Sequence, residues 1–484
     1  MTYDQSVRYL LTLGRELASP QQARAVKFNL ENITAIAARL GHPERAVPAV
    51  HIAGTNGKGS TAAMLASILR AAGLRVGLYT SPHLVRINER IRLFDPLSPT
   101  TPEDIAARRA DGDISDADFA ATFTRVHSVI EDLLASGGLA AHPTYFECVT
   151  AMAFDFFASR KADIAVFEVG LGGRLDSTNI LVPEVAVITQ IDFDHENFLG
   201  HSIEEIAAEK AGIVKPGAWV VSAAGNPAAA QVIRARAALQ NARLVDVDAA
   251  YRISGLHAAD ACYRFVVERA HAEPKSDIAI SLALAGRFQV RNAVTAIAAA
   301  HLLAERGFGI NDDAIVQGLA AVRWPGRLER VQERPAVYFD GTHNPAGARE
   351  LAAFWLEHLA GRRIHLVYGA MRDKAVDEVA GLLFPRATTV ILTQSPQPRA
   401  VSADALASMT RHLARVMEVI PDPVAALRRA LELAAPDDVV FATGSLFVVG
   451  DLHHYWDAHH NLPPGSAPDR PDQADHALRH LKTV

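Results

Sequence analysis

The sequence predicts an α/β protein of two domains, each built around a mostly parallel β-sheet. Short apolar runs of strand type alternate with helical patterns along most of the chain, as is typical of this class. A glycine-rich turn with a lysine joins the first clear strand to the helix after it, and near residues 323–327 the alternation breaks and starts again. We therefore expect a P-loop-containing domain at 1–324, a smaller Rossmann-like α/β domain at 325–462 and a flexible tail at 463–484.

The elements of both series can be placed from their apolar patterns. In the first series we expect helices at residues 61–72 and 147–159, and strands at 47–53, 76–80, 164–169 and 185–191. In the second series we expect strands at 336–339, 364–368, 388–392 and 439–443. Several of these strands are apolar throughout, as are parallel strands that are covered on both faces. The Pro-, Thr- and Asp-rich segment 96–118 is predicted to be a surface excursion.

The composition argues against a nucleic-acid-binding, secreted or membrane-spanning protein. The chain has 484 residues and a formal net charge of −6, so it lacks the basic excess of a general nucleic-acid binder. Its two cysteines, Cys148 and Cys262, cannot form a disulfide framework, and its first residues show no secretory signal. The most membrane-like stretch, residues 293–304, is too short to span a bilayer and is predicted to be a buried core helix. We expect a cytoplasmic monomer that binds neither nucleic acid nor membrane.

The strongest motif is the glycine-rich turn His51-Ile-Ala-Gly-Thr-Asn-Gly-Lys-Gly-Ser-Thr61. Its glycines let backbone N–H groups approach phosphate oxygens without a Cβ clash. Lys58 adds positive charge for the β- and γ-phosphates, and Ser60 or Thr61 can offer a hydroxyl to Mg²⁺. The spacing differs from a Walker A motif, because only two residues separate Gly54 from Gly57 and a glycine follows the lysine. The turn predicts a phosphate-binding loop; the alternative is a plain glycine turn between a strand and a helix.

Acidic and histidine residues lie near the expected strand ends. Glu147 stands in Thr-Tyr-Phe-Glu, Glu168 ends an apolar strand, and His195 follows a strand in Ile-Asp-Phe-Asp-His-Glu. Ligands of doubly wound sheets bind beyond the carboxyl ends of the strands, and Mg²⁺ prefers oxygen ligands. These residues are therefore candidates for a metal site. Asp192 and Asp194 rival His195, because imidazole is a less usual ligand of Mg²⁺; the alternative for each residue is a loop or helix-capping role.

A buried lysine is predicted after the capping box Ser202-Ile-Glu-Glu205. In the helix that this box opens, Lys210 shares one face with the apolar residues Ile203, Ile206, Ala207 and Ala211. A buried ammonium group is costly, so the pKa of Lys210 should fall. The side chain then either meets an anion or reacts as a neutral amine. The alternative is a lysine that snorkels to solvent or forms an ordinary ion pair.

A second candidate site opens the smaller domain. Phe339-Asp-Gly-Thr-His-Asn-Pro-Ala-Gly347 ends a strand and begins a helix. Asp340 and His343 are well placed to hydrogen-bond a nucleotide sugar or phosphate, and Arg327 is expected to reach an acidic ligand lying between the domains. The alternative is a Gly/Asn/Pro turn with a helix cap.

Taken together, these motifs resemble those of the folylpolyglutamate synthase/dihydrofolate synthase family, which are relatives of the Mur peptide ligases. The resemblance covers nearly the whole chain. It is carried, in order, by Gly54-Thr-Asn-Gly-Lys-Gly-Ser60, Thr80-Ser-Pro-His-Leu84, Asn88-Glu-Arg-Ile91, Thr144-Tyr-Phe-Glu147, Glu168-Val-Gly-Leu-Gly-Gly-Arg-Leu-Asp-Ser-Thr-Asn179, Glu209-Lys-Ala-Gly-Ile213, Pro325-Gly-Arg-Leu-Glu329, Asp340-Gly-Thr-His-Asn344 and Thr443-Gly-Ser-Leu446.

The resemblance implies a Mur-ligase-like ATPase domain at 1–324. It also implies which residues bind ATP and Mg²⁺. In the family the glycine loop binds ATP, here Gly54, Thr55, Asn56, Gly57, Lys58, Gly59, Ser60 and Thr61. The Mg²⁺ ligands of the family match Ser60, Glu147 and His195. A family lysine that is typically carbamylated and helps to hold a second Mg²⁺ matches Lys210. That agrees with the predicted burial of Lys210, since a neutral amine can capture CO₂ and become an oxygen ligand.

The resemblance also implies roles for residues outside the glycine loop. The adenine and ribose contacts of the family match Asn292, Arg327 and Asp340, with His343 nearby. The implied catalytic residues are Lys58, Lys210 and His343. The pterin-substrate loop matches Ser81, His83, Arg86 and Glu89. This loop departs from the family, because Ile87-Asn-Glu-Arg-Ile91 stands where many members have Tyr-Thr-Glu-Arg-Ile.

The activity implied is an ATP-dependent ligase that joins L-glutamate to dihydropteroate, to folate polyglutamates or to both. The acid would take the γ-phosphate to form an acyl phosphate, and glutamate would then displace phosphate. One alternative is a Mur ligase for a UDP-muramyl peptide, but such enzymes usually carry a further N-terminal domain, and little chain precedes Gly54. The other is a P-loop ATPase without ligase activity, which the interrupted Lys-Gly-Ser and the Lys210 helix disfavour.

Overall fold

The computed structural model describes residues 1–13, 29–97, 112–259, 261–270, 277–372 and 375–460. The predicted tail at 463–484, and residues 98–111 of the predicted excursion, lie outside this part of the chain. The chain divides into two units. The first unit comprises Met1–Ala283 and Phe288–Arg323, and the second comprises Leu284–Arg287 and Trp324–Val484. The sequence pattern did not suggest that residues 284–287 join the second unit.

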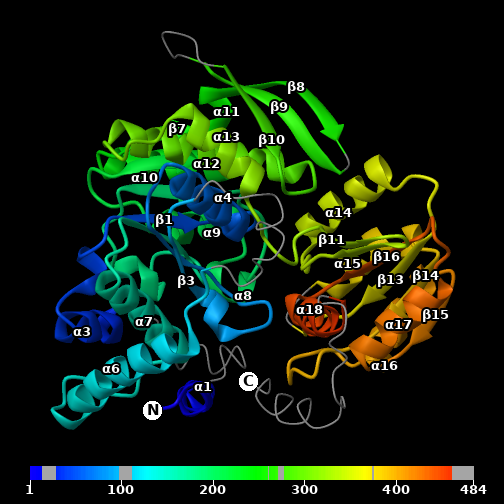
Figure 1. The fold of residues 1–484 in the computed structure, drawn as a ribbon, viewed down its shortest axis with the longest axis horizontal. Helices are drawn as coiled ribbons and strands as arrows, with labels where there is room; N and C mark the ends of the chain where they lie inside the picture. The colour runs from blue at the N-terminus through cyan, green and yellow to red at the C-terminus, as the bar shows by residue number, and fades with distance from the viewer. Residues whose placement is uncertain (14–28, 98–111, 260, 271–276, 373–374, 461–484) are drawn as a thin grey trace. The chain divides into compact units, whose positions relative to one another are not determined.

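The first unit is built on a seven-stranded sheet (Figure 1). The strand order is β3 (Ile91–Phe94), β2 (Val76–Tyr79), β4 (Ile164–Glu168), β1 (Ala49–Ala53), β5 (Val185–Ile188), β6 (Trp219–Ser222) and β7 (Arg243–Asp246). Within this sheet β3 is antiparallel to β2 and the other pairs are parallel. All four strands expected here are present. The parallel order brings the carboxyl ends of β1, β4 and β5 to neighbouring positions on one edge.

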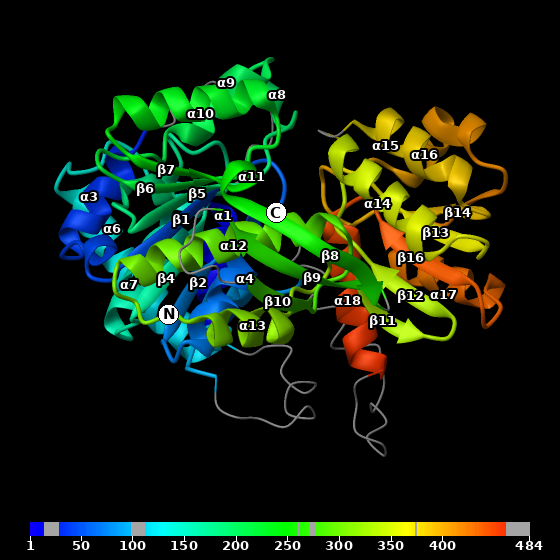
Figure 2. The same ribbon diagram turned by 90° about the horizontal axis from the view of Figure 1, so that it is seen from above.

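Helices cover both faces of this sheet. Figure 2 shows α9 and α10 on one side of the strands and α4, α12 and α13 on the other. The helices are α1 (Tyr3–Thr12), α3 (Glu31–Arg39), α4 (Lys58–Ala71), α6 (Asp116–Ala135), α7 (Tyr145–Ser159), α8 (Glu196–Leu199), α9 (Ile203–Ala211), α10 (Pro227–Leu239), α11 (Val247–Ala250), α12 (Phe288–Glu305) and α13 (Asp312–Ala321). Helix α12 is almost entirely buried, which confirms the predicted core helix. Among the described residues, no helix is long and apolar enough to cross a membrane.

Two parts of the first unit differ from the expectation. Helix α6 begins at Asp116, inside the segment predicted to be an excursion, because Ser115 caps it by accepting from the Asp118 N–H at 3.0 Å. An antiparallel sheet of β8 (Tyr251–Ala259), β9 (Cys262–Arg269) and β10 (Asp277–Leu282) was not anticipated. Buried and exposed residues alternate along β10, so this sheet has no continuous apolar run to mark it.

The second unit carries a six-stranded sheet, coloured yellow to orange-red in Figure 1. The strand order is β11 (Glu329–Glu333), β12 (Ala336–Phe339), β16 (Val439–Thr443), β13 (Ile364–Tyr368), β14 (Thr389–Leu392) and β15 (Met417–Val419). Strand β11 is antiparallel to β12 and the other pairs are parallel. The helices are α14 (Pro345–His358), α15 (Val376–Leu383), α16 (Ala403–Thr410), α17 (Pro423–Leu433) and α18 (Leu446–His460). The four predicted strands and the Rossmann-like class are confirmed.

Candidate active site

The glycine loop lies between β1 and α4 and is held by the segment that follows β5. The Thr55 N–H donates to the Gln190 carbonyl at 2.8 Å, and the Thr189 hydroxyl donates to the Asn56 carbonyl at 2.8 Å. The Thr55 hydroxyl donates to the Asp192 carbonyl at 2.9 Å. These contacts fix the loop at the carboxyl end of the sheet, where the first N–H groups of α4 have no acceptor within their own helix. These N–H groups can donate hydrogen bonds to phosphate oxygens, so the N-terminus of α4 is suited to bind phosphate.

Gly57 shows why this turn requires a glycine. Its φ is +85°, in the left-handed region, and a Cβ there would lie 2.3 Å from Oδ1 of Asn292. The Asn292 side chain therefore lies directly against the loop, as expected for a residue at the nucleotide site. Asn292 donates to Gln289 Oε1 at 2.8 Å, and Gln289 donates to the Ser60 hydroxyl at 3.2 Å. This buried chain orients the Ser60 oxygen, which keeps its own proton and a second lone pair.

Two lysines meet at one carbonyl beneath the loop. Nζ of Lys58 lies 3.0 Å from the Gly54 oxygen, and Nζ of Lys210 lies 2.9 Å from the same atom. Lys210 is buried on α9, which confirms the prediction from its helical spacing. Burial and then the nearby Lys58 charge lower the pKa of Lys210 to about 7, although Asp194 and Asp176 act in the opposite direction. A substantial fraction of Lys210 is thus a neutral amine near neutral pH.

The loop after β4 holds the backbone of α9 around Lys210. Asp176 accepts the N–H groups of residues 170 and 171 at 3.0 and 2.9 Å, which folds residues 170–176 into a compact turn. At Gly173 a Cβ would lie 2.9 Å from the Lys210 carbonyl oxygen, so the turn packs closely on α9. The Arg174 guanidinium pairs with Glu209 at 2.8 Å. Sequence reasoning assigned no role to Asp176, although it lies within a quoted motif.

The residues predicted to bind Mg²⁺ lie on separate elements. Glu147 lies in the first turn of α7, in agreement with the predicted helix at 147–159, and its Oε2 accepts the backbone N–H and the hydroxyl of Thr144, both at 2.8 Å. His195 precedes α8, with its Nε2 3.9 Å from Asp194 Oδ2. No three His, Cys, Asp or Glu side chains among the described residues form a metal-ligand group. The hydroxyl and the carboxylate fit a Mg²⁺ that takes its other ligands from phosphate and water, whereas the imidazole is a less usual ligand.

The predicted substrate loop contains residues of two kinds. The Glu89 carboxylate accepts the backbone N–H groups of residues 84, 85 and 86 at 2.7, 2.8 and 2.7 Å, and so it shapes the loop. Arg86 pairs with Asp116 at 2.6 Å, and both side chains are about half exposed. Asn88, one of the two departures from the family motif, is buried; it accepts from the Tyr3 hydroxyl at 2.6 Å and donates to the Ile114 carbonyl at 2.7 Å. Asn88 therefore links the loop to neighbouring segments.

Ser81 and His83 each contact a residue at the end of a strand: Glu168 ends β4, and Arg90 directly precedes β3. The Ser81 N–H donates to Glu168 at 3.1 Å. Nδ1 of His83 accepts from Nε of the buried Arg90 at 2.9 Å, and the Arg90 guanidinium lies 5.2 Å from the Tyr145 ring centroid. Because a guanidinium only donates, this contact makes Nδ1 of His83 the ring's acceptor and leaves Nε2 as a donor. Sequence reasoning did not assign a role to Arg90.

The candidate residues of the second unit gather after β12. Asp340 is buried, and its two carboxylate oxygens accept the N–H groups of Leu328 at 2.8 Å and Thr342 at 2.9 Å. The Arg327 guanidinium lies over the same turn, since a Cβ at Gly341 would be 2.4 Å from its Nη1. Nδ1 of His343 lies 2.8 Å from the Gly341 carbonyl. Asp340 therefore holds the Arg327 segment in addition to any ligand contact.

Comparison with known proteins identifies the family. The model of the Mur ligase middle domain matches residues 52–300, and that of the Mur ligase glutamate ligase domain matches residues 326–446. The dihydrofolate synthase/folylpolyglutamate synthase of Bacillus subtilis is 38% identical over 429 residues, which cover 88% of this chain and 94% of the relative. The chain belongs to the folylpolyglutamate synthase/dihydrofolate synthase family of the Mur ligase superfamily.

Solved structures of this family share the fold. The Mycobacterium tuberculosis folylpolyglutamate synthase complexed with ADP and AMPPCP superimposes with a TM-score of 0.80 at 32% identity, covering 94% of this chain and 100% of that one. E. coli FolC in complex with DHPP and ADP gives 0.79 at 30% identity, covering 95% and 98%. Family membership confirms the predicted fold class and an ATP-dependent ligase. The roles of single residues stay predictions.

Proposed function

We propose that this chain joins L-glutamate to dihydropteroate, to folate polyglutamates or to both, through an acyl phosphate. The observation that carries this proposal is the pair of lysines at the Gly54 carbonyl, one of them buried with a pKa lowered to about 7. Phosphoryl transfer from ATP to a carboxylate brings two anions together. The positive charge of Lys58, fixed in advance beneath a phosphate-binding loop, lowers the cost of that encounter, and the neutral amine of Lys210 is available to combine with CO₂.

Different groups of side chains bind the different substrates. The glycine loop and Lys58 bind the phosphates, while Asn292, Arg327 and Asp340 bind the nucleoside. Ser81, His83, Arg86 and Glu89 form or shape the site for the pterin acid. Arg90 holds the His83 ring in this loop through Nδ1. In this arrangement the protein aligns reactants and neutralises charge, and it needs no side-chain nucleophile.

Ser60, Glu147 and His195 would hold Mg²⁺, which supplies charge neutralisation at the phosphates. Lys210 would contribute to a second Mg²⁺ site after its neutral amine combines with CO₂. In that step a N–C bond forms, the nitrogen loses one proton, and the side chain becomes a carbamate with oxygen donors. The buried position of Lys210 favours the neutral amine that this step requires.

Two steps then complete the ligation. A carboxylate oxygen of the acid attacks the γ-phosphorus and ADP leaves. The amine of glutamate attacks the acyl carbon, phosphate leaves, and the nitrogen gives up a proton. His343 is the proposed base, because its Nδ1 faces a carbonyl that only accepts, which makes Nε2 the acceptor of the neutral ring.

The test is ligation with purified protein, ATP and glutamate, using dihydropteroate and tetrahydrofolate in parallel. We expect ADP release that requires both the pterin acid and glutamate, with a product heavier by one glutamyl residue. Product from both acids would establish two activities, and product from one would restrict the function to that acid. ATP hydrolysis at the same rate without either substrate, and with no product, would refute the proposal.

A further inference from the structure

The Arg327 segment has a constrained backbone. Gly326 has φ +70° and Leu328 has φ +45°, so two left-handed residues flank Arg327. A non-glycine residue such as Leu328 keeps this conformation only where its surroundings fix it. Three contacts do so: the Gly341 N–H donates to the Gly326 carbonyl at 2.8 Å, the Leu328 N–H donates to Asp340 at 2.8 Å, and the Gly326 N–H donates to Glu329 at 3.0 Å.

The third contact depends on a residue far along the chain. Oε2 of Glu329, which accepts the Gly326 N–H, also lies 2.9 Å from Nε2 of His453 on α18. His453 is buried, with 3% of its surface exposed. Its other ring nitrogen, Nδ1, lies 3.0 Å from Asp457 Oδ2. A carboxylate oxygen can accept from an imidazole N–H, so Nε2 of His453 can donate to Glu329.

Apolar packing fixes the histidine in this position. The Phe339 ring lies 6.0 Å from the His453 ring and 5.9 Å from Trp456, measured between centroids. Phe339 is the last residue of β12, directly before Asp340, and in the sheet it pairs with Glu329. Helix α18 therefore supports both carboxylates that hold the Arg327 segment: Asp340 through Phe339, and Glu329 through His453.

We propose that His453 is a positioning residue for nucleotide binding: by donating to Glu329, it fixes the backbone that presents the Arg327 guanidinium. The proposal rests on the proposed function in one respect, the role of Arg327 toward the nucleotide. Nothing in the reaction requires His453 to touch a substrate. Its loss should therefore weaken binding of adenine nucleotide and leave the chemical step and the affinity for the pterin acid nearly unchanged.

The test compares His453→Phe, which keeps a ring but removes both ring nitrogens, with His453→Gln, whose amide can still donate to Glu329. We expect His453→Phe to raise KM for ATP and Kd for ADP about tenfold, the scale of one charge-assisted hydrogen bond. We expect kcat and KM for the pterin acid to change less than twofold. His453→Gln should recover most of the affinity. The control is His459→Phe, an exposed position on the same helix, which should bind ADP like the wild type.

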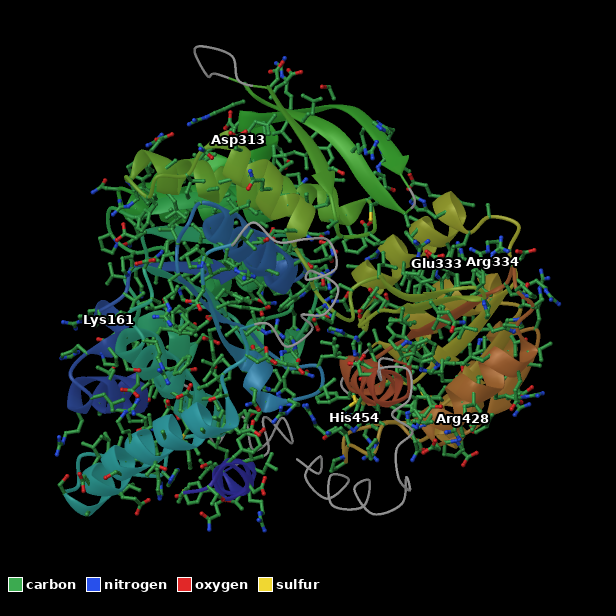
Figure 3. All side chains as sticks on the ribbon, in the orientation of Figure 1. Lys161, Asp313, Glu333, Arg334, Arg428 and His454 are labelled. Atoms are coloured by element: carbon green, nitrogen blue, oxygen red, sulfur yellow. The ribbon has the colours of Figure 1, made fainter. Side chains whose placement is uncertain are left out.

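A second pair of variants keeps the test decisive if His453→Phe folds poorly. Glu329→Gln weakens the acceptor at one end of β11, and Glu333→Gln makes the same change at the other end, beside Arg334 in the β11–β12 turn (Figure 3). We expect Glu329→Gln alone to weaken ADP binding. Combining it with His453→Phe should add little, because both act on one hydrogen bond.

Three outcomes would overturn the proposal: ADP affinity within twofold of the wild type in folded His453→Phe, equal losses in the Phe and Gln variants, or additive losses in the double variant. Calorimetry with ADP needs no turnover, so it decides the role of His453 even if the wild-type protein ligates neither acid. Absence of ligation would instead refute the proposed function.

Discussion

The glycine loop of the first unit and the Asp340 turn of the second unit have the same local design and opposite charge. Each follows a parallel strand and precedes a helix, β1 and α4 in one and β12 and α14 in the other. Beneath the glycine loop two lysines converge on one carbonyl. Around the Asp340 turn, the carboxylates of Asp340 and Glu329 accept backbone N–H groups and hold the segment that carries Arg327.

From this difference we infer that the two regions have different roles, one in the chemical step and one in nucleotide binding. A lysine charge held at a carbonyl beneath a phosphate-binding loop is suited to an anion whose charge rearranges during the reaction. A single cation whose backbone is fixed by carboxylates is suited to recognising a static group. Changes beneath the glycine loop should therefore lower kcat, and changes to the Arg327 segment that Asp340 and Glu329 hold should raise KM for ATP.

The largest effect is expected for Lys210→Met, which preserves the apolar packing of the lysine stem but removes the amine. Loss of the proposed metal ligand beneath the phosphates should lower kcat by about a thousandfold or more. Steady-state ligation measures it. Removing CO₂ and bicarbonate should slow the wild-type enzyme and leave the residual rate of the variant unchanged.

Lys215→Met is the matched control for this prediction. Lys215 also has a pKa lowered by burial, and its Nζ also donates to a carbonyl, that of Asn179 at 2.8 Å. It follows α9 and has no predicted ligand, so turnover should stay close to that of the wild type. Similar rates for Lys210→Met and the wild type would contradict both the carbamate and the division of tasks.

A smaller effect is expected for Gly57→Ala. The new Cβ would meet Oδ1 of Asn292 at 2.3 Å and would also sit at φ +85°. We expect kcat/KM for ATP to fall about a hundredfold, because the chain from Asn292 to Ser60 is displaced as well. Gly73→Ala isolates the backbone cost, since Gly73 has the same φ of +85° and nothing within 4 Å. That control should lose about 1 kcal/mol of stability and no activity. Equal activity losses in the two variants would show that only the left-handed backbone matters.

Arg327→Ala tests the other half of the comparison. Removing the charged group that is proposed to contact the nucleotide should raise KM for ATP about thirtyfold, with kcat changed less than threefold. Arg330→Ala, in β11, is the control, because its guanidinium lies 3.9 Å from the exposed Glu333 and outside the Asp340 turn. A fall in kcat with no change in KM would assign Arg327 to the chemical step and break the comparison.

The sequence predicted those features that local pattern encodes. The apolar runs located the parallel strands, and helical spacing placed Lys210 on a buried face, which the structure confirms. The helix predicted at 147–159 is also present, as α7, and a capping box ties Glu147 to Thr144 at its start.

The residues that sequence reasoning missed act through contacts between distant segments. Gln289 reaches Ser60 across 229 positions, and His453 reaches Glu329 across 124. No periodicity or motif spacing links such partners, because chain topology alone brings them together. The residues within each motif could therefore be predicted from the sequence. The distant residues that orient them could not be predicted.

The smallest effect concerns His51, in β1 beneath the glycine loop. Its Nε2 lies 2.8 Å from the Thr178 hydroxyl, which itself donates to Asp176. Burial lowers the pKa of His51 to about 3. In the unfolded chain this histidine has an ordinary pKa of about 6.5. At pH values between about 3 and 6.5 the unfolded chain therefore binds a proton at His51, and the native state does not. The stability that neutral His51 contributes is complete above pH 6.5 and is lost as the pH falls toward 3. By this linkage the loss between pH 7.5 and 6 is about 0.8 kcal/mol.

His51→Gln should reduce this pH dependence, because an amide can donate to Thr178 without titrating. Amide hydrogen exchange of β1 and of β12, measured at pH 7.5 and pH 6 and corrected for intrinsic rates, separates the two units. We expect wild-type β1 to lose protection at pH 6 relative to the variant, whereas β12 behaves alike in both proteins. Equal losses of β1 protection in the wild type and the variant would show that other groups set the acid response of the first unit. A response confined to β1 would extend the comparison from catalysis to stability, because His51 lies buried and neutral in the strand that leads into the glycine loop.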